Sequence, residues 1–302
     1  MDNFPIRVLA EKTGVAPTTL RAWERRYGLL KPERTPKGHR LYSVKDVEVV
    51  SRIVKLLNDN FTISKAINEI KLEDIQEQAE HLDSLGPPQS AEHWEVFQER
   101  FLGAIERFDE NKLDAIYNEA LSLYPIDLVS SQILRPLLSQ LGLRWKQREA
   151  GIAEEHFFTS YLRNKVGARV HHASGKSKGS RLLLACVPGE YHELGSLLFG
   201  LSAMTRGYRL LFLGADLPLD QVSVVTETTD IDGVVLSAVS VNIRGQFARD
   251  LSQLADELSC PLMLGGSAPE SHMDSVNEKI LFLGDDYRKA LETLEQRVPA
   301  YR

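Results

Sequence analysis

The second half of the chain contains five short apolar runs that alternate with helix-like stretches. The runs cover residues 181–187, 208–213, 233–238, 261–264 and 279–283. A run that is apolar at nearly every position is typical of a strand buried on both faces, as in a parallel sheet. The stretches between the runs supply the helical crossovers that parallel strands need. The pattern therefore predicts an α/β domain with a flavodoxin-like, five-stranded parallel sheet over residues 181–302.

The middle of the chain, residues 93–172, shows no strand-like alternation. Its apolar residues recur at three- and four-residue steps, which places them on one face of a helix. They fall into four groups: Trp94, Phe97, Phe101, Ile105 and Phe108; Leu113, Ile116 and Ala120; Leu128, Leu134, Leu137, Leu138 and Leu141; and Ala153, Phe157, Tyr161, Leu162 and Val166. Four short amphipathic helices predict a four-helix bundle.

Two polar segments divide the chain into modules. The segment 76–92 contains Gly86, Pro87 and Pro88, which cannot continue a helix. Residues 173–180 are small and polar. The sequence therefore predicts an N-terminal module over residues 1–75, a linker over 76–92, the bundle over 93–172 and the α/β domain over 181–302.

Charge is distributed unevenly along the chain. The formal net charge is -6 at pH 7, an average that by itself disfavours binding to nucleic acid. Residues 1–70, however, contain 13 Lys and Arg against 8 Asp and Glu, whereas the remaining residues contain 23 against 34. A basic module on an acidic body is typical of a nucleic-acid-binding module joined to a sensor domain.

The basic module contains a helix-turn-helix pattern. A short helix is expected to end at Gly14, and Pro17 to begin a second helix, in keeping with the preference of Gly for helix ends and Pro for first turns. Thr18, Thr19 and Arg21 stand at the start of the second helix, where side chains of a recognition helix reach base edges. The pattern predicts binding to double-stranded DNA.

A basic hairpin and a capped helix are expected to follow the second helix. Residues 33–35 and 40–43 flank the tight turn 36–39, which contains Lys37 and His39. Ser43, with Asp46 three residues later, resembles a capping box. A basic hairpin beside a recognition helix suits contacts with phosphates and the minor groove.

Several protein classes fit this sequence poorly. The two cysteines, Cys186 and Cys260, cannot form a disulfide framework or a four-thiolate zinc site. No apolar run approaches the roughly 18 residues of a membrane span, and the N-terminus does not resemble a signal peptide. Ser237 stands where a phosphorylated receiver domain would carry Asp. We expect a cytoplasmic protein without membrane association.

Residues 6–57 resemble the winged helix-turn-helix of the MerR family. The motifs are Thr-Leu-Arg-Ala-Trp-Glu-Arg-Arg-Tyr-Gly-Leu-Leu at 19–30 and Gly-His-Arg-Leu-Tyr-Ser at 38–43. The resemblance implies a dimer or higher oligomer on paired half-sites of promoter DNA. The candidate DNA-binding residues are Thr18, Thr19, Arg21, Arg25, Arg26, Tyr27, Lys37, His39, Arg40 and Tyr42.

Polar residues follow the first predicted strand, at the sheet edge where ligands of such folds bind. The spacing Glu190-x-His192-x-x-Gly195 resembles the Asp-x-His-x-x-Gly signature of cobalamin-binding domains. The resemblance implies that His192 is the lower axial ligand of cobalt. An acidic neighbour that hydrogen-bonds the other imidazole nitrogen makes the ring a better donor. Glu190 stands where Asp is usual.

Two further segments extend this resemblance. Ser237 with Val239 resembles a Ser-x-Leu segment, and Gly265 with Gly266 resembles a Gly-Gly segment. In the cobalamin-binding family both segments line the channel for the nucleotide tail, and the Gly corresponding to Gly195 lets the tail pass between helix and sheet. Val239 stands where Leu is usual.

The predicted bundle carries a related motif. Trp145 is followed ten and eleven residues later by Glu155 and His156, which is similar to the CarH/LitR-like light-responsive repressors. The resemblance implies that Trp145 covers the adenosyl group and that the Glu-His pair contacts it. Lys146 stands where the best-known photoreceptor has a His that takes the cobalt after photolysis. A protonated Lys has no lone pair to offer a metal.

The leading hypothesis is a MerR-type transcriptional repressor, not an enzyme. It senses adenosylcobalamin (or another cobalamin) and light through assembly of a homo-oligomer, a dimer or tetramer. In the alternative, which Lys146 and Glu190 motivate, the B12-like domain is degenerate, holds no cobalamin, and binds another small ligand or a regulatory partner protein. A corrinoid-dependent enzyme is disfavoured because no second catalytic domain is present.

Overall fold

The computed structural model describes residues 3–30, 32–35, 38–59, 61–76, 92–145, 148–173, 178–267 and 277–301. The chain forms two compact units, Met1–Phe158 and Thr159–Arg302. The division falls within one long helix, α9 (Gly151–Ala173). Most of the predicted linker, together with Lys37 and Lys146, lies outside the described residues.

The N-terminal module has the predicted order of helix, turn, helix, hairpin and helix. Its elements are α1 (Ile6–Thr13), α2 (Pro17–Tyr27), β1 (Glu33–Arg34), β2 (Arg40–Leu41), α3 (Val44–Asn58) and α4 (Ile63–Gln76). Helix α1 ends at Gly14, whose φ of 69° is readily adopted by glycine. Strands β1 and β2 pair antiparallel. The capping box of Ser43 and Asp46 is confirmed at the start of α3. Leu9, Leu20 and Trp23 form part of the module's buried core.

The helical segment that follows confirms the four expected helices, the third of which is interrupted. Its elements are α5 (Glu92–Ile105), α6 (Glu110–Leu123), α7 (Ile126–Val129), the π-helical turn η1 (Ser130–Leu134), α8 (Arg135–Arg144) and α9. Pro136 lies in the first turn of α8 and has no N–H to donate to the carbonyl of Gln132, four residues earlier. The side-chain amide of Gln98 donates to that carbonyl instead, at 2.8 Å. A proline at this place accounts for the local departure from α-helical geometry.

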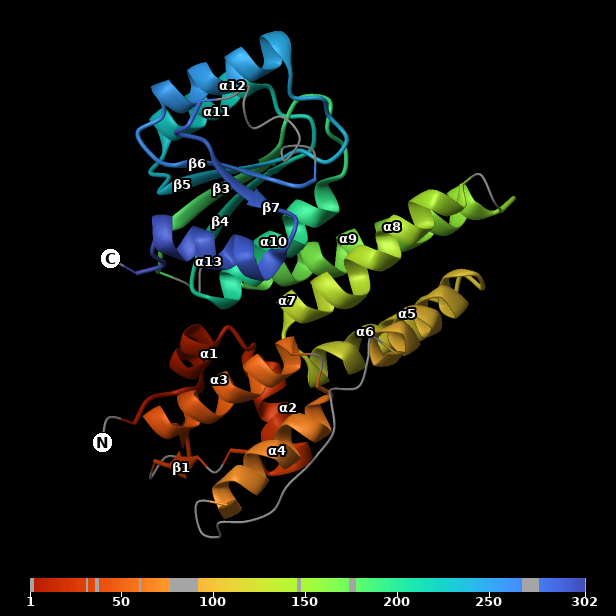
Figure 1. Cartoon of the computed structure of the whole chain (residues 1–302), viewed down its shortest axis with the longest axis vertical. Helices are drawn as coiled ribbons and strands as arrows, with labels where there is room; N and C mark the ends of the chain where they lie inside the picture. Colours follow the sequence, from red (N-terminus) through yellow and green to blue (C-terminus); the bar gives the residue numbers. More distant parts are fainter. Residues whose placement is uncertain are drawn as a thin grey trace. The chain divides into compact units, whose positions relative to one another are not determined.

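The α/β domain has five parallel strands in the order β4-β3-β5-β6-β7. Its strands are β3 (Arg181–Cys186), β4 (Arg209–Gly214), β5 (Gly233–Ser237), β6 (Leu262–Gly265) and β7 (Leu281–Gly284), and its helices are α10 (Glu193–Thr205), α11 (Leu219–Thr228), α12 (Gly245–Glu257) and α13 (Tyr287–Arg297). Figure 1 shows α11 and α12 on one face of the sheet and α10 and α13 on the other. This is the predicted flavodoxin-like arrangement.

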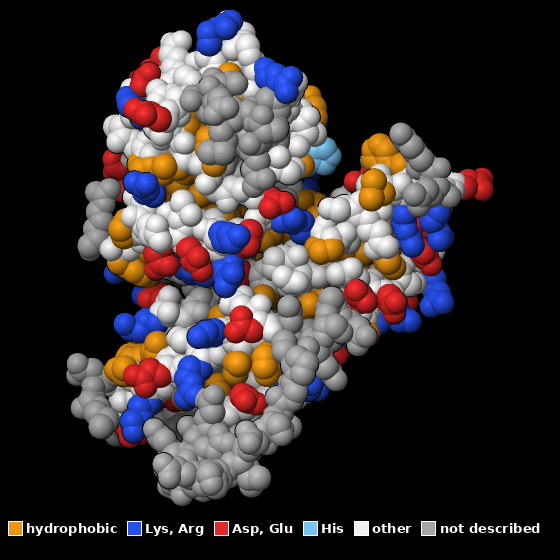
Figure 2. Space-filling model, viewed as in Figure 1, with side chains coloured by type: hydrophobic (Ala, Val, Ile, Leu, Met, Phe, Trp, Pro, Cys, Tyr) orange, Lys and Arg blue, Asp and Glu red, His pale blue; other side chains and the backbone are white. Residues whose placement is uncertain are grey.

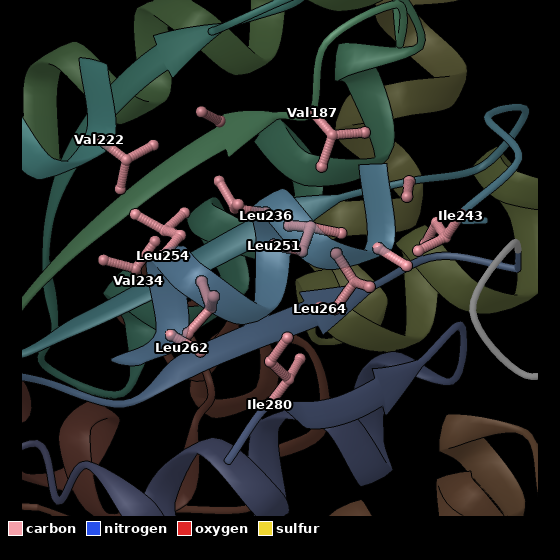
Figure 3. Close-up of a cluster of buried hydrophobic side chains, with 14 of the residues drawn as sticks. Val187, Val222, Val234, Leu236, Ile243, Leu251, Leu254, Leu262, Leu264 and Ile280 are labelled. Carbon is pink, nitrogen blue, oxygen red and sulfur yellow. The ribbon is translucent and has the colours of Figure 1, made fainter. Parts of the chain in front are cut away.

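Both faces of the sheet are buried, which explains why the strands are apolar at consecutive positions. On the face covered by α11 and α12, alternate strand residues such as Val234, Leu236 and Leu264 pack against Val222 and Leu251 (Figure 3). Because adjacent parallel strands end at the same edge, this packing holds the loops after β3, β5 and β6 near one another.

Charged side chains of both signs lie interspersed on the face of the molecule seen in Figure 2. Close charged pairs among the described residues include Arg100 with Glu119 at 2.6 Å and Arg148 with Glu106 at 3.0 Å. Among the helices of the described ranges, none has the length and apolar character that a bilayer crossing requires.

Candidate functional site

The loops after β3 and β5 meet at the carboxylate of Glu190, which is completely buried. Its Oε1 accepts a hydrogen bond from the backbone N–H of His192 at 2.9 Å and lies 2.6 Å from Nδ1 of the same residue. Its Oε2 accepts from the backbone N–H groups of Val239 and Ser240, both at 2.7 Å, and from the Ser240 hydroxyl at 3.1 Å. One side chain therefore joins two loops and orients the imidazole.

The backbone around the site explains why Glu190 points inward. After β3 the chain turns at Gly189, whose φ is 79°. The N–H of Gly189 donates to Asp216 Oδ1 at 2.7 Å, and the N–H of Asp216 donates to the Glu190 carbonyl at 3.0 Å. His192 is the N-cap residue of α10. The loops after three strands, β3, β4 and β5, thus fix the site. Asp216 and Ser240 were not among the predicted site residues, and the one sequence feature that pointed to them is that each follows a predicted strand.

The electrostatics of the site favour an ionised carboxylate. Burial alone would raise the pKa of Glu190, but the backbone N–H groups of Ser240, His192 and Val239, together with the His192 ring, lower it to about 2. An ionised Glu190 accepts the proton on Nδ1, so the neutral ring carries its lone pair on Nε2. The His192 side chain is 67% exposed, and Nε2 can therefore act as a metal ligand.

Glu190→Gln should destabilise the α/β domain at neutral pH, because an amide cannot accept hydrogen bonds at both ends. The folded pKa of about 2 lies below the ordinary value of 4.5. The stabilisation is therefore complete above about pH 4.5 and is lost as the pH falls towards 2. A shift of this size corresponds to about 3 kcal/mol. Urea unfolding at pH 7 and pH 3 measures it, with exposed Glu227→Gln as control; a pH-independent difference would contradict this assignment.

Three predicted glycines lie at the same edge of the sheet. Ser237, at the end of β5, is paired in register with Gly265, at the end of β6. A Cβ atom built on Gly195 or Gly265 would lie 3.6 Å from the Tyr287 hydroxyl or 3.8 Å from the Gly284 carbonyl oxygen, so each position could hold a Cβ at ordinary van der Waals contact. A Cβ on Gly266 would lie 2.2 Å from the carbonyl oxygen of Ala238, and the φ of Gly266 is 106°. Position 266 therefore has to be a glycine, because any side chain there would collide with the backbone of Ala238.

Trp145, Glu155 and His156 lie around the turn between α8 and α9, in the unit Met1–Phe158. The Trp145 side chain is 49% exposed, and His156 is exposed in the second turn of α9. The turn is held by Glu154, which is buried and pairs with Arg148 at 3.1 Å. Glu190 and His192 belong to the other unit, Thr159–Arg302.

Helix α2 presents several of the predicted DNA-binding residues to solvent. Thr18, Arg21, Arg25 and Arg26 are exposed, and so is His39 at the tip of the hairpin. Tyr27 is half-buried. The exposed residues form a surface of hydroxyl and guanidinium groups, which suits contacts with bases and phosphates.

Three predicted DNA-binding residues are engaged within the protein instead. Thr19 is buried and donates a hydrogen bond to the carbonyl of Leu121, so the prediction that it contacts bases is wrong for this structure. Tyr42 is also buried, and its hydroxyl donates to Glu24. Arg40 is half-buried and pairs with the same carboxylate at 2.9 Å. The packing of α2 against its neighbours, which the motif does not encode, places these groups inward.

Comparison with known proteins identifies the N-terminal module and the helical segment that follows it. Residues 4–72 match the family described as MerR HTH family regulatory protein, and residues 97–169 match the family described as B12 binding domain. The chain is 32% identical to the HTH-type transcriptional repressor CarH of Myxococcus xanthus (89% of this chain, 91% of that protein). It is 30% identical to the HTH-type transcriptional repressor CarA of the same organism (96% and 94%).

A solved structure shows the same fold. The monomethylamine corrinoid protein of Methanosarcina barkeri is 16% identical, with a TM-score of 0.51 over 67% of this chain and 99% of that chain.

Together, the helix-turn-helix module and the B12-binding module define a DNA-binding regulator of transcription that senses B12. The chain belongs to the family of the HTH-type transcriptional repressors CarH and CarA.

Proposed function

We propose that this protein is a light-responsive repressor that senses adenosylcobalamin and performs no catalysis of its own. With the cofactor bound it assembles into a dimer or tetramer, whose paired N-terminal modules hold promoter DNA. Light ends the repression. The observation that carries the proposal is the buried Glu190 carboxylate bonded to Nδ1 of an exposed His192, an arrangement suited to a metal-ligating imidazole.

Different residues of the α/β domain would hold different parts of the cofactor. His192 would hold the cobalt through Nε2, while Glu190 keeps the proton on Nδ1. The nucleotide tail would lie beside Gly195 and the segments that contain Ser237, Val239, Gly265 and Gly266, as the resemblance to cobalamin-binding domains implies. When bound, the cofactor supplies a cobalt–carbon bond that light can break.

Selectivity for the adenosyl form is assigned to the turn between α8 and α9. Trp145 covers the adenosyl group with its ring, and Glu155 and His156 contact it. Trp145 is well placed for a ligand contact because half of its side chain is exposed, whereas a core tryptophan is buried. Lys146 replaces the His of the best-known photoreceptor, and a protonated Lys cannot ligate cobalt. Position 146 would therefore supply no second ligand to the cobalt after illumination.

The exposed residues of α2 and the hairpin bind the DNA. Thr18 and Arg21 face base edges, while Arg25, Arg26 and His39 contact phosphates. A single module of this size makes few phosphate contacts, and the remainder of the chain is acidic. Pairing of modules in the oligomer raises the effective concentration of the second module and so provides the affinity.

Gel filtration and DNA-shift assays on the full chain test the proposal. The protein is incubated in the dark with adenosylcobalamin, with hydroxocobalamin, or with no cofactor, and the DNA is the region upstream of its own gene. We expect a larger oligomer and a shifted duplex only with adenosylcobalamin in the dark, both lost on illumination. A visible band that fails to co-elute with the protein would instead favour the degenerate domain that binds another ligand or a partner protein.

A further inference from the structure

Helix α2 hydrogen-bonds to the end of α6 through two side chains. Thr19 Oγ1 donates to the carbonyl oxygen of Leu121 at 2.7 Å, and Trp23 Nε1 donates to the carbonyl oxygen of Leu123 at 2.9 Å. Thr19 is 1% exposed and Trp23 is 0% exposed. Leu121 and Leu123 are separated from these donors by about a hundred residues of sequence. The contact therefore joins the N-terminal module to the helical segment within the unit Met1–Phe158.

The two acceptors are carbonyls that α6 itself cannot satisfy. The last four carbonyls of an α-helix have no intrahelical partner, and a buried carbonyl without a partner is costly. Helix α6 ends at Leu123, and the next residue, Tyr124, is extended rather than a left-handed glycine, so the helix lacks the usual C-terminal cap. The α2 side chains provide that cap. The backbone of Ile63, at the start of α4, adds a third bond by contacting the Tyr124 hydroxyl.

The junction and the DNA-binding surface lie on opposite sides of α2. Successive residues of a helix are rotated by about 100°, so Thr19 and Trp23 share one face. Thr18, Arg21 and Arg25 share the opposite face, and all three are exposed. The contact with α6 therefore leaves the exposed face of the recognition helix accessible to DNA.

We propose that Thr19 and Trp23 dock the recognition helix onto the end of α6, so that the helical segment sets the position of the DNA-binding surface. A displacement of α6 carries α2 with it as one body. Thr19 is a positioning residue, and it acts on DNA binding only through the placement of its helix. The inference rests on the DNA-binding module and is independent of which cofactor the α/β domain binds.

Hydrogen exchange measured by mass spectrometry on the full chain tests the junction. Thr19→Val keeps the shape of the side chain but removes the hydroxyl donor. We expect exchange about tenfold faster in peptides covering 17–27 and 117–124, with no change in β3. Thr19→Ser restores the donor and should restore protection. Trp23→Phe, which removes the second donor, should loosen the same two peptides.

Binding to a random-sequence 20-base-pair duplex at low salt separates positioning from DNA contact. Arg21→Ala, two residues along on the exposed face, should weaken binding threefold or more without changing exchange. Thr19→Val should keep binding within twofold of the unaltered protein. The proposal is overturned if Thr19→Val leaves exchange unchanged in both peptides. It is equally overturned if Thr19→Val weakens DNA binding as much as Arg21→Ala does while protection persists.

Discussion

His192→Ala is expected to weaken adenosylcobalamin binding by at least about tenfold, because losing even an indirect partner of a metal ligand costs ten- to a hundredfold. His192 is the exposed imidazole whose Nδ1 is held by Glu190, and its removal deletes the proposed protein ligand to cobalt. The visible spectrum of the bound cofactor should shift as the axial nitrogen is lost. Equilibrium dialysis in the dark gives the affinity, and absorption spectroscopy gives the ligation state.

His172→Ala is the matched control, because His172 is an exposed histidine near the end of α9. It should leave both the affinity and the spectrum unchanged. Circular dichroism should show that His192→Ala still folds, with a modest loss of stability, because the ring is mostly exposed but its bond to the buried Glu190 carboxylate is lost. The backbone N–H bonds to that carboxylate remain. An unchanged spectrum together with unchanged affinity in His192→Ala would rule out cobalt ligation by this residue.

Gly266→Ala should be among the most destabilising single substitutions in the α/β domain. The new Cβ would lie 2.2 Å from the Ala238 carbonyl oxygen, which is backbone and cannot move aside without shifting the loop after β5. The φ of 106° adds a conformational strain that only glycine avoids. Strain of about 1–3 kcal/mol from the backbone, together with the collision, predicts a loss of about 4 kcal/mol or more. Urea unfolding measures this loss.

Gly245→Ala separates the collision from the backbone strain. Gly245 also has a positive φ, of 58°, but a Cβ there would meet no atom within 4 Å. Its cost should be about 1–2 kcal/mol, the penalty for the left-handed conformation alone. Equal losses for the two variants would show that the loop after β5 relaxes freely and that the close approach does not constrain the site.

Much of the architecture could be predicted because it depends on local patterns. The five strands were predicted from their apolar runs, since a strand covered on both faces carries no polar alternation to obscure it. The turns at Gly14 and the capping box at Ser43 have sequence signatures of their own. The pair Glu190 and His192 was expected from the resemblance of Glu190-x-His192-x-x-Gly195 to the cobalamin-binding signature, and the structure places Glu190 Oε1 2.6 Å from His192 Nδ1.

The remaining features depend on contacts between distant segments, which no local pattern records. The place of Thr19 in the motif predicts a contact with DNA. In the structure Thr19 is buried because α2 packs against α6, where its hydroxyl donates to the Leu121 carbonyl. Ser240 reaches Glu190 because β3 and β5 are neighbours in the sheet. The π-helical turn before Pro136 is compensated by Gln98, which comes from another helix.

The hydrogen bonds of Glu190 also affect how fast the proposed site can bind its cofactor. Glu190 already holds His192 at two atoms, the ring Nδ1 and the backbone N–H. Immobilising a free side chain on binding costs about 0.5–1.5 kcal/mol, and here that ordering accompanies folding. The nitrogen that we propose as the cobalt ligand is thus preorganised, and the rate of cofactor binding should be governed by access to the sheet edge, with little contribution from rearrangement of the imidazole.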